Sequence, residues 1–467
     1  KLRGQLDQTI QATVAKDKES SMTWLRQYRL RLYLRDSIWL FPVLSIAGAL
    51  LSVNLLSRLE RAMGWQMSMS AQTARTIMGT IAGAMFTLVV VVSSAVLVAV
   101  QLASAQLTPR MIPLVYRNTV RRFSLTVFVF TFTFSVAVLV RIEEAAPLLT
   151  GYLAAYGFLL NLCLFLHFID SIGKTVGPPS ALSSVALVGG KVIRAVYPNP
   201  FDEQHSKPPE PIKILDTKPV STVVSSVDGA LLAFDHRGLI SLAQRSNCLI
   251  QLIPQVGDFV AVGDPLFRIY QGGEHLKDSD LRNCVALAQT RNMDQDPMFA
   301  FRIIVDIAAK ALSPAVNDPT TAVLAIDHLH HLLRDVGGRN LVDGYELDET
   351  GRVRLVYRTP NWEDLVRLAV TELRQYGRSS VQVNRRLRAM LQDLIETLPD
   401  RRAPILHNEL TLLVAASKRE FPDLDDQTLA EISDLQGMGG SAVQSRRRDP
   451  TRASSAPAER QKVRTVS

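Results

Sequence analysis

The chain has 467 residues, of which 47% are hydrophobic and 21% are charged, and its formal net charge is +8. Its three cysteines are widely separated, which excludes a disulfide-rich secreted domain and a zinc site built from paired thiolates. A soluble chain usually carries about a quarter charged residues, so this composition predicts that apolar residues are concentrated in one part of the sequence.

Residues 1–36 precede the first long apolar run. Within them, residues 24–36 combine Trp24, Tyr28 and Tyr33 with four arginines. Aromatic residues mixed with arginines are typical of an amphipathic helix that lies at a membrane surface. We therefore predict a juxtamembrane helix here and no nucleic-acid site.

Four uncharged runs follow in the first third of the chain. A hydrocarbon core about 30 Å thick needs about 20 apolar residues of helix, and each run approaches or exceeds that length. We predict an α-helical integral membrane protein with a four-helix transmembrane domain at 37–173, whose spans lie at about 37–56, 76–109, 123–140 and 145–169.

The distribution of arginines predicts the orientation of these spans, because cytoplasmic flanks carry the excess of basic residues. One side has eight arginines in its short flanks: Arg26, Arg29, Arg31, Arg35, Arg110, Arg117, Arg121 and Arg122. The other side has four: Arg58, Arg61, Arg75 and Arg141. Both termini and the long C-terminal portion are therefore expected in the cytoplasm.

The second span carries a polar stripe. Five residues recur every seven positions, and so share one helical face: Thr80, Thr87, Ser94, Gln101 and Thr108. Gly79 and Gly83 lie at its head with the G-x-x-x-G spacing that lets helices approach closely. The stripe is interpreted either as a helix–helix seam or as the lining of a pore within an oligomer. No ring of charged residues interrupts it, so no charge-selective filter is predicted.

The fourth span ends in ionisable residues. His167, Asp170 and Lys174 share a helical face near the predicted cytoplasmic end. Ionisable groups inside a span are candidates for function, but groups at this depth are readily hydrated. An interfacial structural role is the favoured interpretation.

The portion after the spans begins with a predicted linker at 174–220, rich in Gly, Ser and Pro. A small β-rich module is predicted at 221–272, with a strand pair across Asp228-Gly229. Its turns at Gly257-Asp258 and Gly263-Asp264 resemble those of biotinyl/lipoyl barrel-sandwich hybrid domains. The modified lysine of those domains has no counterpart, so a swinging-arm role is not expected.

A helical domain is predicted at 278–436. Asp318 with Pro319 is a typical helix start, so Ser313–Asp318 is predicted to be the turn of a helical hairpin. Candidate ligand-binding residues in and near this hairpin are Arg291, Asp296, Asp306, Ser313, Asn317 and Asp318. An oxygen-ligand metal site of Asp306, Asn317 and Asp318 is the alternative to capping. A second polar cluster, Asp327, His328, His330 and His331, is interpreted as a solvated helix face.

The end of the chain, residues 437–467, is predicted to be a disordered basic tail. Residues 445–467 hold seven Lys or Arg against two acidic residues, a net +5 of the total +8. Contact with anionic lipid is the functional interpretation of this tail. The overall positive charge therefore indicates membrane topology and not nucleic-acid binding.

Three phrases resemble a bacterial membrane-protein family, domain of unknown function 2254. They are TIAGAMFTLVVVVSSAVLVAVQLASAQLTPRMIP at 80–113, PQVGDFVAVGDPL at 254–266 and ALSPAVNDPTTAVLAIDHL at 311–329, together with Arg291-x-x-Asp-x-Asp296. The resemblance covers about residues 30–430. It implies a bacterial inner-membrane protein with four spans and a cytoplasmic domain, and it implies no activity.

The leading hypothesis is an oligomeric inner-membrane protein, channel-like in one interpretation, with a polar second-helix seam and a regulatory cytoplasmic domain. The alternative is a non-conducting membrane-anchored scaffold or sensor that binds a partner through its cytoplasmic domain. A third is a metal-dependent enzyme acting on lipid or envelope precursors through Asp294, Asp296, Asn317 and Asp318. Phosphate-binding, dinucleotide-binding and hydrolase motifs are absent from the sequence, so no enzymatic activity, cofactor or metal is expected. The expected partners are the bilayer and further copies of the chain.

Overall fold

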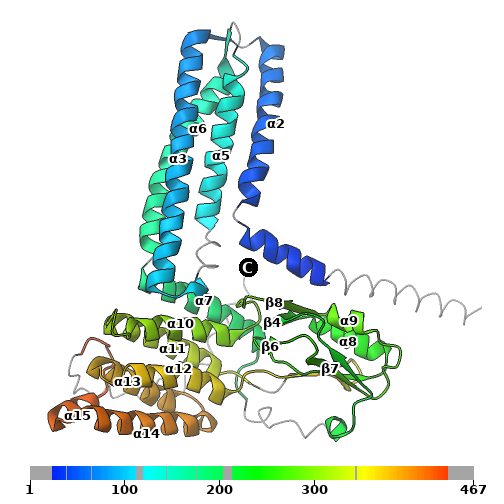
Figure 1. Cartoon of the computed structure of the whole chain (residues 1–467), viewed down its shortest axis with the longest axis vertical. Helices are drawn as coiled ribbons and strands as arrows, with labels where there is room; N and C mark the ends of the chain where they lie inside the picture. Colours follow the sequence, from blue (N-terminus) through cyan, green and yellow to red (C-terminus); the bar gives the residue numbers. More distant parts are fainter. Residues whose placement is uncertain are drawn as a thin grey trace, which may run out of the picture.

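A computed structural model of the chain describes residues 24–37, 39–64, 66–111, 119–142, 145–175, 177–202, 213–341 and 344–439. A four-helix bundle stands on an extramembrane part made of a helical domain and a sheet module (Figure 1). Residues 1–23 and 440–467, which include most of the predicted basic tail, lie outside the described residues.

The bundle confirms the four predicted apolar runs. Within the described residues, four helices are long and apolar enough to cross a membrane. They are α2 (Leu40–Met63), α3 (Ala71–Gln106), α5 (Thr119–Leu139) and α6 (Leu148–Thr175). Aromatic residues fill the space between them, with Phe128, Phe134 and Phe168 buried. At the far end from the extramembrane part, β1 (Gln66–Ser70) pairs with β2 (Ala145–Pro147).

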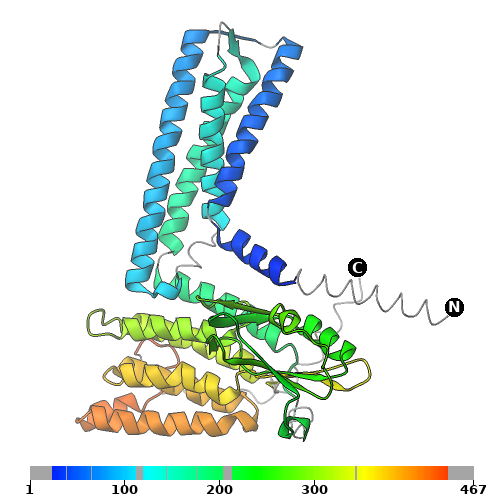
Figure 2. The same cartoon turned by 45° about the vertical axis from the view of Figure 1, so that its right-hand side comes forward.

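Helix α3 is much longer than its neighbours. Its 36 residues would extend about 54 Å, whereas about 20 residues suffice to cross the hydrocarbon core. Ser70 caps its start by accepting a hydrogen bond from the Thr73 backbone N–H at 3.1 Å. The lower part of α3 therefore continues below the bundle and reaches the helical domain (Figure 2).

The predicted linker at 174–220 is wrong in its first half. Residues Pro178–Val196 form helix α7, whose Leu182, Val185 and Ile193 are buried in the core of the helical domain. The prolines at the start mark the first turn of a helix, where a missing N–H costs nothing. Gly189 lies against α10 (Pro297–Ala311), and a Cβ placed there would lie 2.7 Å from the Cβ of Ala300. The Gly-rich composition thus reflects close helix packing.

The sheet module contains two sheets. A five-stranded sheet has the order β3-β7-β5-β10-β9, from Ser221–Val224, Pro265–Tyr270, Leu249–Leu252, Val353–Tyr357 and Gly344–Leu347. A three-stranded sheet has the order β6-β4-β8, from Phe259–Val260, Gly229–Phe234 and Val285–Ala288. Two short helices complete the module: α8 (His236–Arg245) and α9 (Asp278–Arg282).

Several predictions for this region are wrong. The strands on either side of Asp228-Gly229 do not pair, because β3 joins the five-stranded sheet and β4 the three-stranded one. The module does not end at 272, because β8, β9 and β10 come from the range predicted to be a helical domain. β10 pairs in parallel with β5, about 100 residues earlier in the chain. A barrel-sandwich hybrid is not confirmed.

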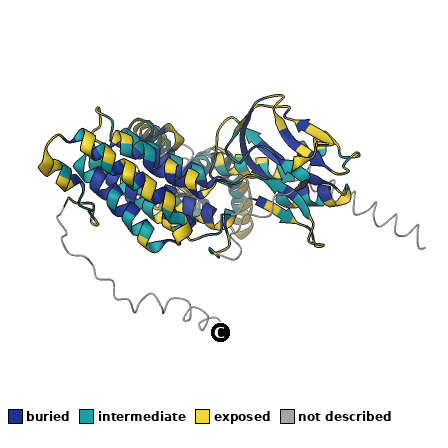
Figure 3. Cartoon of the chain, turned by 90° about the horizontal axis from the view of Figure 1, so that it is seen from below, coloured by how far each residue is buried: buried dark blue, intermediate teal, exposed yellow. Residues whose placement is uncertain are grey.

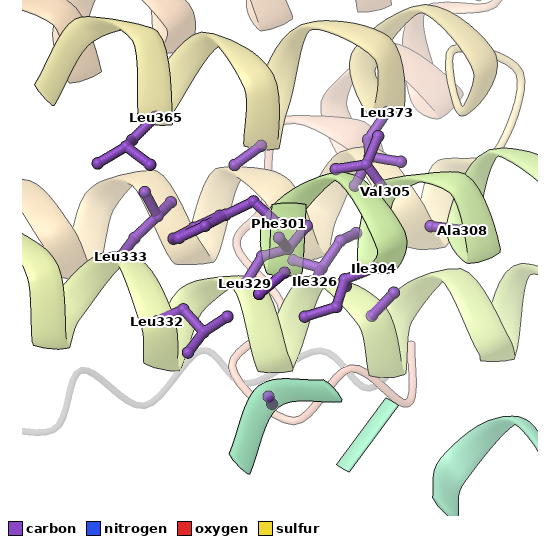
Figure 4. Close-up of a cluster of buried hydrophobic side chains, with 14 of the residues drawn as sticks. Phe301, Ile304, Val305, Ala308, Ile326, Leu329, Leu332, Leu333, Leu365 and Leu373 are labelled. Atoms are coloured by element: carbon purple, nitrogen blue, oxygen red, sulfur yellow. The ribbon is translucent and has the colours of Figure 1, made fainter. Parts of the chain in front are cut away.

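The helical domain is built from α7, α10 and five further helices stacked below the bundle (Figure 2). These are α11 (Pro319–Gly337), α12 (Trp362–Tyr376), α13 (Val381–Thr397), α14 (Ala403–Glu420) and α15 (Leu424–Ala430). Phe301 and Ile304 of α10 lie among Leu329, Leu333 and Leu365 of α11 and α12 (Figure 4). Seen from below, exposed residues lie mostly on the outward helix faces (Figure 3).

The segment 431–439, at the end of the described chain, is hydrogen-bonded to α13. Arg385, 2% exposed, donates from Nε to the Ile432 carbonyl at 3.0 Å and from Nη1 to the Gly439 carbonyl at 2.9 Å. The buried carboxylate of Asp434 accepts from the backbone N–H groups of Gln436, Gly437 and Gly439. Residues 437–439, predicted to belong to the disordered tail, therefore pack against the helical domain.

The N-terminal helix, residues 24–36, confirms the predicted helix and runs from the foot of α2 across the sheet module (Figure 1). Trp24, Leu25, Tyr28 and Leu32 pack against the small residues of β4 and β8. Arg35 donates two hydrogen bonds to the Asp294 carboxylate, at 2.7 and 2.9 Å. The hydroxyl of Tyr28 donates to the same carboxylate at 3.1 Å.

Candidate functional site

The polar stripe of α3 faces away from its own bundle. Thr80, Thr87, Ser94 and Gln101 are exposed, whereas the opposite face, which includes Met78, Met85, Val92 and Ala99, is buried. A seam between helices of one chain is therefore wrong, because a helix buries only the face turned to its neighbours. Thr108 differs from the other four, since it is 6% exposed and lies at the foot of α3.

Two hydroxyls of the stripe, those of Thr80 and Thr87, donate hydrogen bonds within α3. Thr80 donates to the Thr76 carbonyl at 2.8 Å and Thr87 to the Gly83 carbonyl at 3.1 Å. A Cβ added at Gly79 or Gly83 would meet nothing within 4 Å. The outward side of α3 therefore has open space next to both glycines. The hydroxyls of Thr80 and Thr87 need no water or partner chain, because each already donates to a carbonyl of its own helix.

The foot of α3 is built into the helical domain. Ala103, Leu107 and Met111 are at most 3% exposed and belong to the same core cluster as α7, α10 and α11. Lys310 of α10 donates to the Ser104 carbonyl at 3.0 Å. The helical domain therefore cannot move far from α3 without opening a buried apolar contact.

Asp306 lies at this junction and belongs to an ion-pair chain, not to the hairpin turn. Its carboxylate binds Arg110, from the 3₁₀ turn Pro109–Met111, and accepts from Arg302 Nε at 2.6 Å. Arg302 in turn pairs with Glu372 of α12, with Nη2 at 2.8 Å from Oε2. The chain of charges thus runs from the foot of α3 through α10 to α12.

The hairpin prediction is confirmed. Asp318 caps α11 by accepting from the Thr321 backbone N–H at 3.0 Å, and Asn317 has a φ of +47°. Ser313 donates its hydroxyl to the Lys310 carbonyl at 2.7 Å. The turn residues are thus engaged in local structure.

Asp296 and Arg291 lie at the other end of α10. Asp296, 4% exposed, caps α10 by accepting from the Phe299 backbone N–H at 3.1 Å. Burial raises its pKa to about 6. A Cβ at Gly257 would lie 2.6 Å from its Oδ2, so the glycine of the predicted turn makes room for this carboxylate. Arg291 is exposed.

The hypothesis of a metal-dependent enzyme placed four residues in one site, and the structure does not bring them together: Asp294, Asp296, Asn317 and Asp318. The first two precede α10 and the last two follow it, and its 15 residues separate them by about 22 Å. Within the part of the chain that the structure describes, no three His, Cys, Asp or Glu side chains are grouped to hold a metal ion.

The second polar cluster is only partly a solvated face. Asp327 accepts from Arg386 Nε at 2.5 Å, and His330 Nε2 lies 2.9 Å from Asp393. Both pairs join α11 to α13. On the fourth span, Lys174 pairs with Asp170 at 2.7 Å, and both are exposed.

A cleft of about 1300 Å³ lies between the sheet module and the helices, and the sequence did not point to it. Its walls come from six separate segments, within 195–202, 234–240, 255–256, 294–297, 340–347 and 357–360. No local motif joins these segments. Two sequence signals lie near it: Asp294, a candidate residue of the metal-enzyme hypothesis, lines the cleft, and the predicted turn at Gly257-Asp258 follows two lining residues.

One wall of the cleft carries an aromatic and acidic cluster. The His236 ring stacks on Phe234, with centroids 4.0 Å apart, and meets the edge of Tyr357 at 5.1 Å. Glu346 accepts from the Tyr357 hydroxyl at 3.4 Å and lies 3.5 Å from His236 Nδ1. Burial lowers the pKa of His236 and raises the pKa of Tyr357. This wall therefore presents a neutral imidazole beside a carboxylate.

A family model described as "Predicted membrane protein (DUF2254)" matches residues 35–393. Uncharacterized proteins of Mycobacterium bovis and Mycobacterium tuberculosis strain H37Rv are each 26% identical over 420 residues, covering 85% of this chain and 79% of the relative. A protein of M. tuberculosis strain CDC 1551 is 25% identical over the same length. No solved structure matches. Because the family match spans the bundle, the sheet module and the helical domain as far as α13, the chain belongs to the DUF2254 family of predicted membrane proteins.

Proposed function

We propose that this protein is an inner-membrane protein that self-associates through the outward face of α3, and that its cytoplasmic domain controls this contact. One observation carries the proposal: the helix with the exposed small-residue stripe is also the helix whose foot is buried in the helical domain. The excess of arginines at the end of the bundle next to the domain supports a cytoplasmic position for it.

The outward face of α3 carries a narrow stripe of small residues, flanked by bulky exposed side chains that include Phe86, Val90 and Leu97. Exposed side chains on α2 and α6 include the bulky Leu51, Leu55, Tyr156 and Leu160, which suit lipid. In a bilayer, helices associate where small residues let the backbones approach, because there is no hydrophobic driving force between them. Gly79 and Gly83, together with the hydroxyl positions Thr80, Thr87 and Ser94, provide such a surface on α3.

The buried foot supports control by the cytoplasmic domain. Arg110 and Lys310 link the lower end of α3 to α10 on both sides of the junction. A rearrangement of the helical domain would therefore tilt or rotate α3 and change the face offered to a second copy.

Conduction is not part of the proposal. The threonine hydroxyls are bonded to their own helix, so they do not require a water-filled path. The stripe from Thr80 to Gln101 carries no charge, and charged rings are one common basis of ion selectivity.

Cysteine cross-linking in native membranes tests the proposal. In a Cys163→Ser background, Thr87→Cys is expected to give a cross-linked dimer under mild oxidation. The matched control is Leu160→Cys, an exposed position on α6 (55% exposed). Equal cross-linking at the two positions, or none at Thr87, would contradict self-association through α3. A cross-linking rate at position 87 that is unchanged by Asp306→Ala would contradict control by the domain.

The cleft favours a second candidate function, a membrane-anchored sensor whose partner is a small-molecule ligand. Its volume of about 1300 Å³ is large enough to hold a small molecule, since such sites usually measure about 300–1,000 Å³. Glu346 and His236 place polar groups on its wall. A thermal-shift screen of nucleotides, amino acids and organic acids tests it. A compound that stabilises the wild type but not Glu346→Gln would support it, whereas no stabilising compound in the panel would count against it.

A further inference from the structure

Strand β9 forms one edge of the five-stranded sheet, and this edge lines the cleft between the sheet module and the helices. It pairs with β10 on one side, and within the described residues no strand pairs with its other side. All four of its residues, Gly344–Leu347, line the cleft. Because successive side chains of a strand point to opposite faces, a cavity that touches all four runs along the edge of the strand.

An unpaired strand edge presents a row of backbone N–H and C=O groups that can bind another extended chain. In β9 this row is short, since four residues at about 3.3 Å each extend about 13 Å, the length of a peptide of about three or four residues. The cleft, of about 1300 Å³, has room for such a peptide, because sites of about 300–1,000 Å³ hold drug-sized molecules. The edge therefore favours a peptide over a ligand without backbone amides.

The cleft also contains charged groups that lack partners of opposite sign. Arg237 and Arg358 are exposed and line the cleft, and among the residues that the structure describes they have no hydrogen bond or ion pair. Glu346, 38% exposed at its side chain, has two partners, the Tyr357 hydroxyl at 3.4 Å and the imidazole of His236 at 3.5 Å. Burial lowers the pKa of His236, so this imidazole is neutral near pH 7 and does not offset the carboxylate.

The two arginines lie next to the groups that contact Glu346. Arg237 follows His236 in the chain, and Arg358 follows Tyr357. The rings of His236 and Tyr357 have centroids 5.1 Å apart. The carboxylate and the two guanidinium groups thus belong to one region of the cleft, yet they form no ion pair with one another in the described structure. A ligand with both a positive and a negative group complements this arrangement.

The other carboxylates that line the cleft are already engaged. Asp294 accepts hydrogen bonds from Arg35 at 2.7 and 2.9 Å, and Asp202 has a polar interaction of its own. Apolar side chains on the walls include Ile240 and Val256. The cleft therefore offers a ligand one free carboxylate, two free guanidinium groups and an apolar surface.

We infer that the cleft binds a short peptide with free termini, in an extended conformation along the outer edge of β9. The backbone amides of the peptide pair with this edge, its ammonium group binds Glu346, and its terminal carboxylate binds Arg237 and Arg358. A side chain of the peptide lies against the apolar wall. This inference rests on the second candidate function, the sensor, because it names the class of ligand that the sensor binds.

Isothermal titration calorimetry of the detergent-solubilised full chain with the tripeptide Ala-Phe-Ala tests the site. N-acetylation removes the positive terminus of the peptide, and C-terminal amidation removes the negative one. We expect each modification to weaken binding to the wild type by about 10- to 150-fold, the loss of a hydrogen-bonded charge. The zwitterion 8-aminooctanoate has the same number of chain atoms and no amide groups, and it is expected to bind at least about tenfold more weakly than the tripeptide.

Matched variants assign each terminus to its partner. Glu346→Gln is expected to weaken binding of the free peptide as much as N-acetylation does, and N-acetylation should then have no further effect. The double variant Arg237→Gln/Arg358→Gln should respond to amidation in the same way. All three side chains are at least partly exposed, so the substitutions are expected to leave the fold intact, which the thermal midpoint without peptide checks. Arg419→Gln, at an exposed position on α14, is the control and is expected to bind like the wild type.

Equal binding of the free and blocked peptides, or blocking effects that persist in the variants, would overturn the inference. Equal binding of 8-aminooctanoate would overturn the pairing with β9. If the tripeptide does not bind but a nucleotide, amino acid or organic acid does, and Glu346→Gln abolishes that binding, the peptide inference is wrong and the sensor stands. If none of these compounds binds, both are wrong. Self-association through α3 is tested separately by cross-linking.

Discussion

Leu107→Ala tests whether the foot of α3 belongs to the core of the helical domain. Leu107 follows α3 directly, is 2% exposed and lies in the core cluster shared with α10. Truncating a fully buried leucine costs about 2–5 kcal/mol, from lost burial and from the cavity left behind. Since 1.4 kcal/mol is a factor of ten, the opening that separates the foot from α10 should become about 30- to 4,000-fold more frequent.

Amide hydrogen exchange in lipid nanodiscs measures this opening. We expect peptides covering α10 to exchange faster in Leu107→Ala by a factor within that range. The matched control is Leu97→Ala on the same helix, where the side chain is 57% exposed and should cost less than about 1 kcal/mol. Exchange in Leu107→Ala that equals the wild type or the Leu97 variant would refute the buried foot.

Three further predictions concern single carboxylates. Asp296→Asn should raise the thermal midpoint at pH 8 but not at pH 4. Burial raises the pKa of Asp296 to about 6, so the folded state favours the protonated carboxyl group and is destabilised by the ionised one above that pH. Replacing the carboxylate with a neutral amide should therefore stabilise the fold by about 1–3 kcal/mol at pH 8. Asp434→Ala removes the acceptor of three backbone N–H groups and should speed proteolysis within 431–439, for a cost of about 1–3 kcal/mol. Asp294→Asn should speed amide exchange in the N-terminal helix about fivefold, since its partner Arg35 is 36% exposed and the pair contributes about 1 kcal/mol. Unchanged values in any of these measurements would contradict the corresponding contact.

The membrane spans and the hairpin turn could be predicted because their signals are local. Uncharged runs of about 20 residues have few alternatives to a membrane helix. Asp318 followed by Pro319 combines a capping side chain with a residue suited to the first turn, and the structure places both there.

The helix α7 could not be predicted because its composition has two explanations. Gly189 and the prolines at 178 and 179 suit a linker as well as a helix that starts at proline and packs closely. Only the position of Ala300, on a helix more than 100 residues later, decides between them.

The sheet module and the cleft depend on contacts between distant segments. β10 adds to β5 in parallel, and a parallel pairing is not signalled by any turn between the two strands. Likewise, the heptad spacing of Thr80, Thr87 and Ser94 shows that they share a face but does not say which neighbour that face meets. Their exposure follows from the packing of the other three spans.

Because α3 is a long helix, a small tilt at one of its ends produces a larger displacement at the other. No proline interrupts its 36 residues, and no glycine occurs after Gly83, so the lower part has no obvious hinge. A rod about 54 Å long moves by about 1 Å at one end for each degree of tilt about the other. A displacement too small to disturb the packing of the helical domain at its foot would therefore be amplified along the outward face of α3, where a second copy would meet it.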